Sequence, residues 1–202
     1  MLWSNLYPDL LPVAPGCPDP LLEKLVRIAA IEFLRRTRAW VEWLDPVMSV
    51  QGLTEYDFDL PAGADVTRVV RATVDGAPID VVSYRDATYD MARKALADQG
   101  LVSRDLKTFR MGNSVASGRL IQVQVALVPS RKSTGIPDDL FEKYRDDIAH
   151  GAKAGILALP DFFSADLLMF EKAAFESAIN TASVDAWRGH TGNTQRARLR
   201  LC

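Results

Sequence analysis

Cysteine and histidine are scarce in this chain, and their scarcity excludes several kinds of site. Among 202 residues there are 2 cysteines and 2 histidines. Cys17 and Cys202 lie near opposite ends of the sequence, so we expect two unpaired thiols of a reducing compartment rather than a disulfide framework. Neither a Cys-x-x-Cys pair nor a cluster of cysteine with histidine occurs. The sequence therefore predicts no zinc site, and no cofactor is expected.

Long apolar runs and an excess of positive charge are missing as well. No apolar run approaches the roughly 20 residues that a membrane helix needs. Residues 1–16 contain proline and aspartate in place of a basic leader, so neither a membrane span nor a signal peptide is expected. The chain is 48% hydrophobic and 25% charged, as globular domains are. Its net charge of −2 argues against a nucleic-acid binder that works through bulk positive charge.

The charge is unevenly distributed along the chain. Residues 188–202, RGHTGNTQRARLRLC, contain four arginines and no acid. The other residues therefore carry −6, which is the net charge of −2 less the +4 of this segment. An acidic body with a basic tail is typical of a protein with an interaction arm.

Helical periodicity is found near both ends of the chain. Residues 1–18 are rich in proline and are predicted to be an extended N-terminal arm. Apolar residues at three- and four-residue steps predict a helix over 19–38, with Asp19 as its N-cap and Pro20 at its first position. Two long helices are predicted within 137–187, the second of them capped by Ser164.

The residues between these helices alternate with the period of two that indicates β-strands. Two β-branched runs flank Asp75-Gly76, which predicts a hairpin because its tight turn needs positive φ. A clear strand is predicted over 120–128 and a weaker one over 107–111, and a short helix over 86–100. The expected fold is α+β, a helical bundle with an inserted antiparallel sheet and extended terminal arms. The predicted organisation is an arm over 1–18, a domain over 19–187 and a tail over 188–202. Within the domain, the helical core is 19–38 and 137–187, and the β-rich insert is 40–128.

Two pairs of side chains are candidates for catalysis or metal binding. Asp146 and His150 are four residues apart on a predicted helix, from which they could ligate a metal, although a solvated helix face explains them as well. Asp57 and Asp59 lie on one side of a predicted strand and could do acid–base work, although the wet face of a strand also accounts for them. A small hydrolase is therefore one alternative function, and a nucleic-acid-binding module that uses the arginine tail is another.

The helices near the C-terminus carry a signal for close packing. Gly151, Ala152 and Gly155 cluster on one helix, where each glycine costs about 1 kcal/mol relative to alanine. Close approach of another helix would offset this cost, either at a tight internal crossing or at a contact between subunits. The last helix has two apolar stripes, and a helix of this kind is buried on several sides. The stripes are Leu167, Phe170, Ala174 and Ala178, and Leu168, Phe175, Ile179, Ala182 and Ala186. Neighbouring copies would supply the burial, so the predicted subunit-packing residues are Gly151, Ala152, Gly155, Leu168, Phe175 and Ile179.

The order of these features resembles the head-to-tail adaptor, or connector, proteins of tailed bacteriophages, especially those of short-tailed phages. In the C-terminal half the resemblance lies in a strand ending Leu127-Val128-Pro129, in Ile136-Pro137, and in the spacing of residues from Leu140 to Pro160. In the N-terminal half it lies in the helix end from Phe33 to Trp40, in YDFDLPAG at 56–63, and in the VDGAP hairpin. The resemblance covers residues 19 to 185.

This resemblance implies a structural virion protein and not an enzyme. It implies a homo-oligomeric ring, commonly of twelve copies, that binds the portal protein on one side and tail-nozzle or tail-tube proteins on the other, with tail fibres as a further contact. The ring would line the passage through which viral DNA is retained after packaging and is later ejected, without sequence-specific binding. No membrane is involved. The protein is expected at the portal vertex of the virion after assembly in the host cytoplasm.

The resemblance also assigns surfaces to partners. In related connectors a C-terminal extension docks on the portal, which here implies Arg188, Arg196, Arg198, Leu199, Arg200 and Leu201. The β insert and the 112–118 loop are expected on the outside of the ring or on its tail side, and the predicted tail-facing loop residues are Asp75, Gly76, Gly112 and Asn113.

Overall fold

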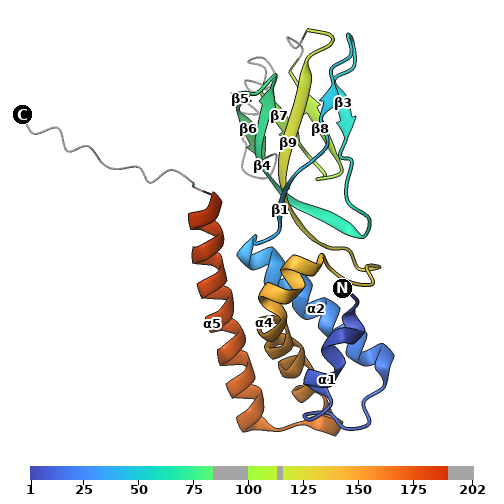
Figure 1. Cartoon of the computed structure of the whole chain (residues 1–202), viewed down its shortest axis with the longest axis vertical. Helices are drawn as coiled ribbons and strands as arrows, with labels where there is room; N and C mark the ends of the chain where they lie inside the picture. The colour runs from blue at the N-terminus through green and yellow to red at the C-terminus, as the bar shows by residue number, and fades with distance from the viewer. Residues whose placement is uncertain (84–99, 113–115, 191–202) are drawn as a thin grey trace, which may run out of the picture.

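The computed structural model describes residues 1–83, 100–112 and 116–190. The chain has an α+β fold in two parts, which Figure 1 shows one above the other: a bundle of helices, and a β region that extends beyond one end of the bundle. The predicted fold class is confirmed. Residues 86–99 of the short helix that the sequence predicts lie outside the described residues.

Three long helices form the bundle, and α5 runs along its outer side (Figure 1). They are α2 (Asp19–Thr37), α4 (Asp138–Leu157) and α5 (Ala165–His190). The short helical segments are η1 (Trp3–Leu6), α1 (Tyr7–Leu10) and η2 (Pro160–Phe162). Pro20 lies in the first turn of α2 as predicted, but the N-cap is Pro18, so Asp19 is helical rather than a cap. None of the helices in the described part of the chain is long and apolar enough to cross a bilayer.

The prediction of an extended N-terminal arm is wrong, because residues 1–18 fold onto the bundle. Trp3 is 1% exposed, and its indole N–H donates a hydrogen bond of 2.9 Å to the carbonyl oxygen of Ser133. Pro8 does not prevent helix formation because it lies in the first turn of α1. The residues of this segment that are buried recur at three- and four-residue steps, and they are Trp3, Leu6, Leu10, Ala14 and Cys17.

Two sheets make up the β region. The first has the order β1-β9-β4-β5, with β2 also paired to β9, and the second has the order β3-β8-β7-β6. The strands are β1 (Val41–Trp43), β2 (Val47–Met48), β3 (Glu55–Asp57), β4 (Ala64–Val74), β5 (Ala77–Ile79), β6 (Val81–Ser83), β7 (Leu101–Ser103), β8 (Thr108–Met111) and β9 (Leu120–Pro129). The sequence predicts only antiparallel pairing, but β6 and β7 pair in parallel. The long strand β9 leads back to the bundle, and the buried residues form one core that continues through both parts.

The predicted hairpin is confirmed at the turn between β4 and β5. Asp75 and Gly76 have φ values of +49° and +80°, as a tight turn between twisted strands requires. The Asp75 carboxylate accepts hydrogen bonds from the backbone N–H of Leu120 at 2.8 Å and from the Arg119 guanidinium at 2.5 Å. These hydrogen bonds, that from Leu120 above all, lower the pKa of Asp75.

Candidate functional site

The inner face of α5 packs within the chain. A Cβ added to Gly151 of α4 would lie 2.6 Å from Cε2 of Phe175, so the glycine allows α5 to approach α4 closely. Gly155 faces Leu25 of α2 in the same way, at 3.3 Å from its Cδ2. Ala152, Phe175 and Ile179 are buried in this single copy, and Leu168 is half-buried. Of the two explanations for the glycines, the internal crossing is therefore the one that the structure shows, and these residues are not an exposed interface.

Polar contacts also hold α5 to the rest of the bundle. The Arg36 guanidinium of α2 donates two hydrogen bonds to the Glu176 carboxylate, at 2.6 and 2.5 Å. The hydrogen bonds from Arg36 lower the pKa of Glu176. His150 Nδ1 lies 2.5 Å from Oε2 of the buried Glu171, which joins α4 to α5 a second time.

The outer face of α5 is uncharged and exposed, with large apolar side chains at both ends. Phe170 is 64% exposed and Trp187 is 69% exposed, although both are large apolar side chains. They belong to a stripe at alternating three- and four-residue steps that contains no charged residue. The stripe consists of Phe170, Ala173, Ser177, Asn180, Val184 and Trp187, and we call it the outer stripe. A surface helix normally presents charge to water on this side, so the outer stripe is a candidate contact with another protein.

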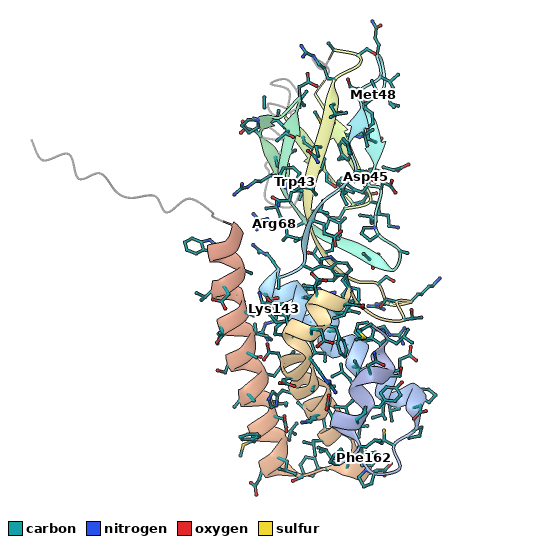
Figure 2. The ribbon with its side chains drawn as sticks, in the orientation of Figure 1. Trp43, Asp45, Met48, Arg68, Lys143 and Phe162 are labelled. Atoms are coloured by element: carbon teal, nitrogen blue, oxygen red, sulfur yellow. The ribbon has the colours of Figure 1, made fainter. Side chains whose placement is uncertain are left out.

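A second apolar surface lies at the end of the β region that is farthest from the helices, where Figure 2 labels Met48. Met48 is 60% exposed and pairs with Leu120, whose side chain is also exposed. We call the set Met48, Val50, Leu53 and Leu120, all exposed, the sheet-end surface.

One of the two predicted tail-facing turns falls at the same end of the molecule. Asp75 bonds to Leu120, which places the Asp75-Gly76 turn beside the sheet-end surface. Gly112 is buried and donates its N–H to the carbonyl oxygen of Gly100. Asn113 lies outside the described residues. The sequence predicted the turn here but not the exposed apolar side chains beside it. These side chains occur singly in short strands and bends, so no periodic pattern indicates them.

A groove that the sequence analysis did not identify runs between α2 and the β region. It has a volume of about 990 Å³, and α2 contributes Lys24, Ile28, Ile31 and Arg35 to its wall. These four residues follow one another at helical spacing on a single face, which is the signal that could have found the groove. Arg35 also lines an adjoining hollow of about 600 Å³, together with Arg38, Arg68 and Arg104. Positive charge is thus concentrated on one side of a chain whose net charge is −2.

The residues that the sequence offered for catalysis or metal binding do not converge on a substrate-sized site within the described ranges. His150 contacts Glu171 rather than Asp146, which is exposed. Asp57 and Asp59 are also exposed, and the hollow beside them measures about 10 Å³, less room than a substrate needs. No group of three or more His, Cys, Asp or Glu side chains in the described ranges is arranged to hold a metal ion.

The basic tail begins inside a helix rather than after one. α5 continues to His190, so the backbone of Arg188 is helical. The other residues predicted to dock on the portal lie outside the described part of the chain, and they are Arg196, Arg198, Leu199, Arg200 and Leu201. No protein-family model matches the chain, and no curated protein matches it.

Proposed function

We propose that this chain is a structural subunit of a tailed-bacteriophage virion, a head-to-tail adaptor that forms a ring between the portal and the tail. The ordered resemblance of residues 19 to 185 to connector proteins supports this assignment. The observation that carries it is the outer stripe of α5, because an uncharged helix face with exposed Phe170 and Trp187 is suited to burial by another protein. Complete burial of one large apolar side chain contributes about 1.5–3 kcal/mol.

Each exposed surface takes a role in this proposal. The outer stripe contacts a neighbouring copy in the ring. The sheet-end surface, with the Asp75-Gly76 turn, contacts tail proteins. Residues 191–202 contact the portal and follow directly from the last turn of α5. α5 ends beside the junction of the bundle and the β region (Figure 1). A segment of this length spans up to about 40 Å when extended.

Native mass measurement of the chain mixed with the portal protein of the same virus tests the proposal. We expect a complex that contains a portal ring and many copies of this chain. A variant that lacks residues 191–202 should keep its circular dichroism spectrum and its ability to join other copies, but should bind the portal more weakly. A wild-type chain that never associates with the portal or with itself, at any salt concentration, would reject the proposal.

A double variant tests whether the sheet-end surface contacts tail proteins. The variant Met48→Ser/Leu120→Ser should still bind the portal, because the exchanged side chains are exposed and far from the helical bundle. It should bind tail proteins more weakly. Equal binding of tail proteins by the variant and the wild type would remove this surface from the proposed tail contact.

A further inference from the structure

We propose that the groove between α2 and the β region receives the outer stripe of α5 from a second copy of the chain. This inference rests on the proposed ring, and it names the two surfaces that would meet at each contact. The composition of the groove and the composition of the stripe support it.

The groove has an apolar floor with cations at its sides. Ile28 is 49% exposed although it is a large apolar residue in the middle of α2. Lys24 and Arg35 lie one turn before it and two turns after it, and neither forms a salt bridge with any residue that the structure describes. Lys107 and Arg131 extend the positive charge along the groove. These features suit an occupant that is apolar along one face and acidic beside it.

The groove is lined by six cations and three acids, so the acids offset only part of this charge. Glu32 contacts Arg36, which keeps it beside its own helix. The Asp105 carboxylate accepts hydrogen bonds from the backbone N–H groups of Lys107 and Thr108, both at 2.9 Å. Asp65 is the remaining acid of the wall.

α5 has the complementary composition. Between Asp166 and Trp187 the helix contains four acids and one lysine. Glu171 and Glu176 are engaged with His150 and Arg36, whereas Asp166 and Asp185 are exposed at the two ends of the helix without a salt bridge to any described residue. The outer stripe itself is uncharged, and these two acids lie near its two ends. An acidic, apolar helix therefore faces outward on the same chain that carries a basic, apolar groove.

The outer stripe has the shape of a helix-packing face. The outer stripe from Phe170 to Trp187 is about 26 Å long at 1.5 Å per residue. Ala173 and Ser177 are small and lie in its middle, so another helix can approach closely there. The large side chains at the ends, Phe170 and Trp187, would fill the groove.

Pairing of two different surfaces has a consequence for assembly. Each copy would use its outer stripe on one neighbour and its groove on the other, which is a heterologous contact. Repetition of such a contact forms a closed ring when the rotation between copies closes. The proposed pairing is therefore of the kind that an adaptor ring requires.

Charge reversal with rescue tests the pairing in the full-length chain. We expect the groove variant Lys24→Glu/Arg35→Glu and the helix variant Asp166→Lys/Asp185→Lys each to reduce the assembled fraction, measured by native mass with portal present, by roughly tenfold or more. A chain that carries all four changes should recover assembly, because attraction is restored with the opposite sign. The single changes Lys143→Glu and Asp80→Lys, at exposed positions outside the groove and α5, serve as controls and should assemble like the wild type.

The possible results separate this inference from the proposed function. Wild-type rings that tolerate both double reversals would overturn the pairing and leave the adaptor proposal standing. The pairing would also be overturned if the groove variant lost only a salt-dependent affinity for DNA and still assembled, since the groove would then serve nucleic acid. Failure of the wild type to assemble would overturn the adaptor proposal, and the pairing with it.

Discussion

Gly151 of α4 lies against the aromatic ring of Phe175 of α5, so closely that a Cβ on the glycine would be 2.6 Å from the ring. This contact fixes which side of α5 is used inside the chain. The helix turns Phe175, Ile179 and Ala182 toward the bundle and leaves its other side to solvent. The exposed outer stripe is thus a consequence of the contact between these two residues.

Substitution of Gly151 by alanine should destabilise the chain by about 1 kcal/mol. Overpacking against the buried Phe175 costs about 1–3 kcal/mol, and the better helix propensity of alanine offsets about 1 kcal/mol of this. Urea denaturation followed by circular dichroism measures the difference. Phe175→Leu introduced together with Gly151→Ala should recover part of the loss because it makes room at the crossing.

Gly155→Ala is the matched control for this crossing. Its new Cβ would meet only the flexible end of Leu25, at 3.3 Å, so the gain in helix propensity should remain. We expect unchanged or slightly raised stability. If both alanine variants behave alike, the close contact of Gly151 with Phe175 does not determine the packing of α5.

Trp3 should contribute strongly to stability although it is near the N-terminus. Trp3→Ala should cost about 3–5 kcal/mol, as the loss of a fully buried aromatic side chain does. Trp3→Phe keeps most of the apolar contact and loses the hydrogen bond to Ser133, so it should cost about 1 kcal/mol. Thermal and urea unfolding measure both values. A Trp3→Ala variant as stable as the wild type would show that residues 1–18 are an arm after all.

The Arg36–Glu176 pair should make the attachment of α5 depend on pH. Because the pKa of Glu176 is lower in the folded chain, its stabilising effect is present above the ordinary pKa of glutamate and is lost as pH falls through the lowered pKa. Glu176→Gln should therefore increase hydrogen exchange in α5 near pH 7, and should do so much less at a pH below the lowered pKa. A difference between variant and wild type that is equally large at both pH values would contradict this account. Added salt should also reduce the effect, since both side chains are partly exposed.

The hairpin at the far end of the β region should depend on the backbone of Gly76. Gly76→Ala should destabilise the chain by about 1 kcal/mol, because φ is +80° and no neighbouring atom lies within 4 Å of the new Cβ. Gly76→Asn should cost less, since asparagine adopts positive φ more readily. Urea denaturation of both variants checks this ranking. The reverse ranking would contradict a purely conformational role for Gly76.

Local sequence patterns predicted the helices and the longest strands because each depends on a short repeat. The stripe of α2, the turn at Asp75-Gly76 and the apolar run of β9 are all of this kind. The prolines of residues 1–18 predict an extended arm, but the helical spacing of Trp3 and Leu6 with the apolar residues that follow determines how this segment folds.

Contacts between distant residues could not be predicted in the same way. Gly151 indicated a close approach, but the partner is 24 residues along the chain, and only the fold distinguishes Phe175 from a residue of another copy. The groove beside Ile28 forms because β9 returns to α2, so the helical spacing of its α2 residues indicates a shared face but not what lies opposite that face. The parallel pairing of β6 with β7 likewise depends on the path of the chain between them.

Electron microscopy of the chain mixed with the portal protein of the same virus tests the central claim most directly. The account predicts a ring of this chain on the axis of the portal, with α5 of each copy against α2 of the next and with the sheet-end surface of Met48 and Leu120 directed away from the portal. Particles in which folded chain and portal are both present but no coaxial ring forms would contradict it.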